Sequence, residues 1–143
     1  MNMFKNVLAS IDLGDETSST RVINAALEVM AGDDTLHVMC VVPDYGNSMV
    51  GTFFPEGHEK DMIDHATRAL HDFTEKHIPK GRRVQHIVAH GIIYEEIITA
   101  ANKCQADLIV VGSHRPALKD YLLGPNAARV MRHARQSVLV VRD

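Results

Sequence analysis

Five short apolar runs are spaced along the chain and predict the strands of one sheet. Each run is continuously apolar and does not alternate with polar residues, which is typical of parallel strands buried on both faces. The runs are Asn6 to Ile11, Thr35 to Val42, Val84 to Ala89, Leu108 to Val111 and Val138 to Val141. We therefore expect a single open parallel five-stranded sheet.

Between these runs, apolar residues recur at the spacing of an amphipathic helix. Four such segments are present, Val22 to Met30, Met62 to Phe73, Ile93 to Ala101 and Ala127 to Ala134. Gly32 stands where a left-handed residue would close the first helix. The alternation of strands and helices predicts an α/β fold with helices on both faces of the sheet, and one domain over residues 1–143.

The loop after the fourth strand is the first candidate for chemistry. The apolar run stops at Gly112 and continues into Ser113, His114 and Arg115. A helix with Pro125 in its first turn follows Gly124. A loop between a strand end and a helix start gathers free backbone N–H groups and the positive end of the helix dipole. This segment is therefore suited to binding a phosphate.

The sequence of this segment resembles the signature of the universal stress protein family. The matching fragments are VVGSHR, LLG and VLVV, together with VLASID near the start and QADLIVVGS before the loop. In the ATP-binding branch the signature is Gly, two residues, Gly, nine residues, then Gly with Ser or Thr. Gly112 and Gly124 match its first and third glycines. The motif is degenerate, as in the UspF and UspG type, because Arg115 replaces the second glycine, Pro125 replaces Ser or Thr, and the spacer is one residue short.

The resemblance implies a Rossmann-like sheet of the adenine nucleotide alpha hydrolase kind, with strand order 3-2-1-4-5. In such sheets a ligand binds where the strand order reverses, here between the first and fourth strands. Ser10, Ile11 and Asp12 end the first strand, and Asp12 matches the family's nucleoside-contacting acid. Val41 matches the position whose backbone meets the adenine. The alternative for Asp12 is that it caps the turn that follows it.

The departures from the motif change the expected phosphate contacts. A glycine allows the backbone to approach a phosphate closely, as expected at Gly112, and Arg115 cannot do the same. Its guanidinium can instead supply side-chain donors to phosphate oxygens. Asn126 keeps an amide donor beside Pro125, which has no N–H. The alternative is that Arg115 is a solvated loop residue.

Composition and charge exclude several classes of function. The net charge of −3 gives no general attraction to nucleic acid. The chain has no run of 18 apolar residues, so we expect no membrane span and a cytoplasmic location. Cys40 and Cys104 form no CxxC pair and are expected to be buried thiols. Nine histidines are present, but those at 58, 65, 71 and 77 are not spaced to share a metal, and no metal site is predicted.

The functional hypothesis is an ATP-binding stress-response protein that acts as a nucleotide-dependent signalling or protective module. ATP, with AMP and ADP as alternatives and Mg²⁺ as a companion, is the expected ligand. No catalytic residue is predicted, so the protein is not expected to be an enzyme. The rival hypotheses are a nucleotide-free stress protein dimer and a slow ATP hydrolase with His114 near the phosphates. The resemblance implies a homodimer through the edge strand Ser137 to Arg142, whose unpaired backbone groups and VLVV sequence invite pairing.

Overall fold

The computed structural model describes residues 3–43, 58–113 and 124–142. Its elements, in chain order, are β1 (Phe4–Ser10), α1 (Glu16–Glu28), β2 (Met30–Pro43), α2 (His58–His77), β3 (Arg83–Gly91), α3 (Ile93–Lys103), β4 (Leu108–Gly112), α4 (Pro125–His133) and β5 (Ser137–Val141). The five strands form one parallel sheet in the order β3-β2-β1-β4-β5. The predicted fold class and strand order are confirmed.

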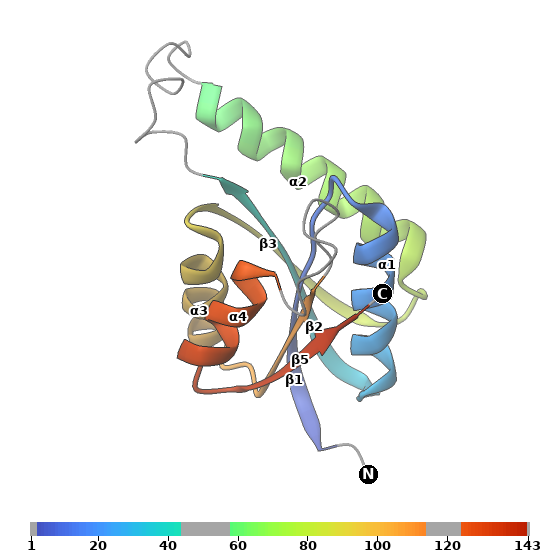
Figure 1. The fold of residues 1–143 in the computed structure, drawn as a ribbon. Helices are drawn as coiled ribbons and strands as arrows, with labels where there is room; N and C mark the ends of the chain where they lie inside the picture. The colour runs from blue at the N-terminus through green and yellow to red at the C-terminus, as the bar shows by residue number, and fades with distance from the viewer. Residues whose placement is uncertain (1–2, 44–57, 114–123, 143) are drawn as a thin grey trace.

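Two helices cover each face of the sheet (Figure 1). On one face, Val22 and Ile23 of α1 and Leu70 of α2 pack against β-strand side chains such as Val7. On the other face, apolar residues of α3 and α4 pack against strand residues that point the opposite way, namely Leu8, Met39, Ile109 and Val111. Both faces are therefore buried, which is why the strands are continuously apolar.

The first helix ends differently from the expectation. α1 stops at Glu28 and Val29 is its C-cap, with the Val29 N–H donating to the Ala25 carbonyl at 3.3 Å. Gly32 lies inside β2 and is not in the left-handed region, so the predicted glycine cap is wrong. The pairing of β1 with β2 shifts register between Phe4 and Asn6, which accommodates the early residues of β2 as a bulge.

Gly91 is the glycine whose conformation the fold requires. It ends β3 with φ +145°, a value that residues with a side chain rarely adopt. A Cβ there would also lie 3.2 Å from Cγ of Glu96 on α3. A glycine at position 91 therefore has both a conformational and a packing reason. No helix in the described part of the chain is long and apolar enough to cross a membrane.

Candidate functional site

A cavity of about 810 Å³ lies at the carboxyl ends of β1, β2 and β4. It occupies the point where the strand order reverses between β1 and β4, the place at which open α/β sheets bind ligands. Its walls come from the β1–α1 turn, the first half of α2 and the beginnings of α3 and α4. Its lining includes Ser10, Ile11, Asp12, Asp15, Ser18, Ser19, Cys40, Val41, Val42, Asp61, Met62, His65, Ala66, Ile97, Val111, Gly112, Gly124 and Asn126.

Most of the described residues predicted for the site meet at this cavity. Its lining contains Ser10, Ile11, Asp12, Val41, Gly112, Gly124 and Asn126. Ser113 and Pro125 are not part of the lining; the Ser113 hydroxyl donates to the Val141 carbonyl at 3.3 Å, and Pro125 is exposed at the start of α4. The predicted phosphate contacts of His114 and Arg115 lie outside the described residues.

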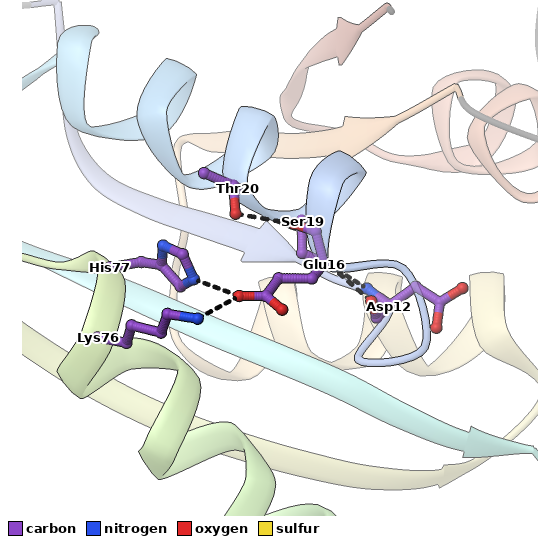
Figure 2. A network of polar contacts seen from close by, with 6 residues as sticks. All are labelled: Asp12, Glu16, Ser19, Thr20, Lys76 and His77. Atoms are coloured by element: carbon purple, nitrogen blue, oxygen red, sulfur yellow. Dashed lines mark hydrogen bonds and ion pairs between the residues drawn. The ribbon is translucent and has the colours of Figure 1, made fainter.

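The turn between β1 and α1 is held by a closed set of hydrogen bonds (Figure 2). The Ser19 hydroxyl donates to the Asp12 carbonyl at 2.6 Å and accepts from the Asp12 N–H at 3.1 Å. The Asp12 carboxylate accepts from the Gly14 N–H at 2.9 Å, and Asp15 caps α1 by accepting from the Ser18 N–H at 3.1 Å. Asp12 therefore caps the turn, as the alternative interpretation held. Only its Oδ1 atom is used for this, so a ligand contact through Oδ2 stays compatible with the cap.

Gly112 is required by helix packing at the end of β4. A Cβ at this position would lie 2.9 Å from the Ser18 Oγ and 3.3 Å from Val22 Cγ2, both on α1. The first distance is shorter than real Cβ contacts, so a larger residue would displace the Ser18 side chain or α1. Gly112 does not have a positive φ. The sequence predicts that this glycine makes room for a phosphate. The structure gives another reason for a glycine here, which is the close approach of α1.

The start of α4 presents free backbone donors to the cavity. Gly124 is the N-cap and makes no side-chain cap, and Pro125 at the first helical position has no N–H, as predicted for this proline. Along α4, the first backbone N–H that donates to a carbonyl is that of Ala128, which donates to the Gly124 carbonyl at 3.0 Å. Within the described residues the N–H groups of Asn126 and Ala127 have no partner. Both residues line the cavity, so these donors and the helix dipole favour an anion there.

The other side of the cavity is acidic. Asp12, Asp15 and Asp61 line it, and His65 is the one basic side chain in the described lining. Burial, and secondarily the Asp12 carboxylate, raises the pKa of the Cys40 thiol to about 11. Cys40 is therefore a protonated, unreactive thiol at neutral pH. The described residues contain no group of three or more His, Cys, Asp or Glu side chains that could hold a metal by themselves.

Sequence reasoning did not identify Ser19 or the α2 wall. Ser19 is fully buried, and it stands at i, i+3, i+4 and i+7 with Val22, Ile23 and Ala26, which are also buried. This shared periodicity could have identified Ser19 as buried. A buried serine on an apolar helix face needs a hydrogen-bond partner, which would have pointed to a role in the turn. The α2 wall had no such signal, since the approach of α2 to β2 and β3 depends on tertiary packing.

α1 and α2 are also tied together outside the cavity. Glu16, in the first turn of α1, accepts from Lys76 Nζ at 2.9 Å and contacts His77 Nε2 at 3.0 Å (Figure 2). The hydrogen bond from Lys76, followed by that from His77, lowers the pKa of Glu16. Glu16 and Lys76 are exposed, so this contact is a weak clamp between the beginning of α1 and the end of α2.

Comparisons with known proteins agree with this architecture. The structure of hypothetical protein MJ0577 has a TM-score of 0.81 at 24% identity, covering 99% of this chain and 97% of that chain. A universal stress protein solved in complex with cAMP has a TM-score of 0.62 at 21% identity, with 97% of each chain covered. At these identities the two structures show the fold.

The sequence comparisons show the family. Universal stress protein G of Escherichia coli O157:H7 is 27% identical over 142 residues, which are 98% of this chain and 100% of that protein. The model of the universal stress protein family matches residues 3–142, nearly the whole chain. The chain belongs to the universal stress protein family.

Proposed function

We propose that this universal stress protein binds an adenine nucleotide, with ATP as the expected ligand, and acts as a nucleotide-dependent signalling or protective module in the stress response. The observation that carries the proposal is the cavity at the reversal of strand order, closed on one side by the uncapped start of α4. Its volume of about 810 Å³ is within the usual range for small-molecule sites. A fold neighbour, at 21% identity, was solved with cAMP, which supports an adenine nucleotide as the class of ligand.

The cavity has separate regions suited to the two ends of a nucleotide. The N–H groups of Asn126 and Ala127, together with the Asn126 amide, are the donors for phosphate oxygens. Ile11, Val41 and Val42 supply apolar surface for the base, and the free Oδ2 of Asp12 is an acceptor for a ribose hydroxyl. The predicted roles of Asp12 and Val41 are thus compatible with a single bound nucleotide.

Charge favours a nucleotide that brings a divalent cation. The described lining contains three carboxylates, and a polyphosphate would be repelled by them. Mg²⁺ is commonly bound through one or two carboxylates plus substrate phosphates, so a complete protein cage is not needed. Asp12 and Asp15 are the carboxylates that line the cavity on the β1–α1 side. When bound, the cation would neutralise phosphate charge. We propose binding and not turnover, since no catalytic residue is predicted for this site.

The proposal is tested by calorimetric titration with ATP and magnesium, using Asn126→Asp as the decisive variant. A carboxylate in the first turn of α4 favours the helix, by about 0.3 to 1 kcal/mol, but repels phosphate. We expect unchanged or higher thermal stability together with at least tenfold weaker ATP binding. Asn24→Asp, on the exposed face of α1, is the matched control and should bind as the wild type does. Absence of heat with wild-type protein would favour the nucleotide-free rival.

We also propose that the protein forms a two-fold dimer through β5. This strand lies at the edge of the sheet, and Met131 on α4 is 51% exposed. Arg129 and His133 of α4 lie against Tyr94 of α3, and Met131 is about 200° around the helix from each, on the opposite flank. Because α4 contacts α3 and β5, we infer that the flank turned away from α3 faces the β5 edge. An exposed apolar side chain beside an unpaired edge supports an isologous contact.

Met131→Glu is the appropriate test of the dimer. Val140 is partly buried against the α3 and α4 cluster, so a charge at Val140 would damage the fold as well as an interface. Sedimentation of the wild type at micromolar concentration should give about twice the chain mass, and Met131→Glu should shift the distribution toward monomer. Arg132→Glu, which changes charge on the same helix away from its buried face, is the control for charge alone. A wild type that stays monomeric contradicts the dimer and leaves the nucleotide proposal intact.

A further inference from the structure

The contact between α2 and the edge strand β3 combines apolar packing with a pair of histidine side chains. The rings of His71 on α2 and His86 on β3 are stacked, with centroids 3.7 Å apart and planes 21° apart. Thr74, which is buried, lies one turn further along α2 and places its Oγ1 2.7 Å from His86 Nε2. The same hydroxyl donates to the His71 carbonyl at 3.1 Å, so the neutral His86 ring donates from Nε2 to Thr74. Charging His86 therefore requires a second proton on Nδ1.

The surroundings of His86 do not compensate a positive charge. On α2 its ring neighbour is His71, which is flanked along the helix by exposed Arg68 and Glu75. On β2 the residues of this sheet face are Leu36, Val38 and Cys40, and the Cys40 thiol stays protonated. On β3 the same face carries Val84, Val88 and His90, of which His90 pairs with Glu59. No carboxylate among the described residues contacts His86.

Burial, followed by the charge of His71, lowers the pKa of His86 below its ordinary value of 6.5. Two stacked imidazoles cannot both be charged at this separation without mutual repulsion. At the two ends of α2, by contrast, each histidine lies beside a carboxylate that favours its charged form. Glu59 contacts His90 at 2.9 Å near the start of the helix, and Glu16 contacts His77 at 3.0 Å near its end. Protonation of His90 or His77 adds attraction to these pairs.

We propose that the His71–His86 stack is a pH-sensitive latch, which holds the middle of α2 on β3 at neutral pH and releases it as the imidazoles become protonated. The ends of α2 stay tied by their carboxylate pairs, so acid loosens the helix between them. Asp61, Met62, His65, Ala66 and Ala69 form the α2 wall of the cavity, and Ala69 is two residues from His71. The latch therefore couples proton concentration below pH 6.5, the ordinary pKa of histidine, to the shape of the cavity wall.

The sign of the effect follows from the direction of each pKa shift. Because the pKa of His86 is lower in the folded state, the unfolded chain takes up the proton first, and stability falls as pH drops below 6.5. Above that pH, His86 makes no difference to the pH dependence. The lowered pKa of Glu16 gives a contribution that is present above its ordinary value of 4.5 and is lost only in stronger acid. The contribution of His86 is therefore lost at a higher pH than that of Glu16, and the comparison with His86→Gln separates it from the contributions of the other histidines.

The latch is tested on the ligand-free protein, so the outcome does not depend on nucleotide binding. Thermal unfolding midpoints at about pH 7.5 and about pH 5.5 are compared for the wild type, His86→Gln and His133→Gln. Glutamine keeps a donor for Thr74 but does not titrate, and His133 is an exposed histidine on α4. We expect the midpoint to fall on acidification in the wild type and in His133→Gln, and to fall clearly less in His86→Gln. Equal falls in all three proteins would overturn the proposal.

A second measurement uses only the wild type and so covers the case in which His86→Gln fails to fold. Proton NMR of the ring hydrogens should give His86 a titration midpoint below 6.5, the ordinary value. Amide exchange, corrected for its intrinsic pH dependence, should accelerate between Leu70 and Thr74 on acidification more than in α1. A midpoint at or above 6.5, or uniform protection along both helices, contradicts the latch.

Discussion

The two sides of the cavity differ in how their backbone groups are satisfied. On the β1–α1 side, Ser19, Asp12 and Asp15 use one another and the neighbouring N–H groups, so the turn is complete without a ligand. On the α4 side, the N–H groups of Asn126 and Ala127 have no partner in the described chain, and no side chain caps the helix. The first side is a preformed wall and the second is a set of donors available to an anion. Mutations should therefore affect stability on the first side and ligand binding on the second.

Gly112→Val should have the largest effect, and it should act on stability. The valine Cβ would lie 2.9 Å from the Ser18 Oγ and 3.3 Å from Val22 Cγ2, so these side chains or α1 itself must shift to make room for it. We expect a loss of about 1 to 3 kcal/mol in the free energy of unfolding, the usual cost of overpacking. Urea denaturation measures it. Gly14→Ala is the control, because its Cβ would meet the Asp12 side chain at 3.2 Å at an exposed position. An equal loss in both would mean that packing against α1 is not the reason for Gly112.

Ser19→Ala should come next. It removes one hydroxyl that serves both the N–H and the carbonyl of Asp12, and Ser19 is 1% exposed, so water does not replace it. The expected loss is about 1 to 2 kcal/mol in the same measurement. Thr20→Ala removes a hydroxyl that donates to the Glu16 carbonyl on the exposed surface, and it should change stability by less than about 0.5 kcal/mol. Similar losses for the two variants would contradict the view that the turn is a closed unit.

Asp12→Asn should have the smallest effect, and it tests the electrostatic influence of the β1–α1 side on the Cys40 thiol. The Asp12 carboxylate is the second cause of the raised pKa of Cys40, after burial. Its neutralisation should lower the thiol pKa from about 11 by a modest amount and leave it above the ordinary value of 9.0. Thiolate absorbance as a function of pH measures this in a Cys104→Ser background, which leaves Cys40 as the single thiol. No change in the Cys40 pKa would show that the carboxylate points away from the thiol in solution.

The sequence predicted where the backbone brings the site residues together better than it predicted what their side chains contact. Ser10, Asp12 and Gly112 could be placed together because parallel strands deliver their carboxyl ends to one edge, whatever their loops do. The sequence allows Asp12 either to contact a nucleoside or to cap the following turn. The hydrogen bond from the Gly14 N–H identifies the capping role and leaves the nucleoside contact possible through Oδ2. The packing of Gly112 against α1 could not be predicted, since it depends on Ser18, which stands 94 positions earlier in the chain.

The chain by itself determined the order and type of the elements, because hydrophobic periodicity is a local property and each strand and helix carries its own pattern. It also determined that Pro125 begins a helix, since proline fixes φ and lacks an N–H. Gly32 shows where local reasoning fails, because pairing with β1 drew the residues after Glu28 into a strand and removed the need for a left-handed cap.

Only the tertiary structure decided which side chains meet across elements. The stack of His71 on His86, the clamp from Glu16 to Lys76 and the α2 wall of the cavity join residues on different helices and strands. A helix of 20 residues such as α2 presents several faces, and its periodicity does not say which residue lies opposite a given strand position. That alignment is set by how the apolar side chains of α2 pack into the sheet, which is a property of the assembled core.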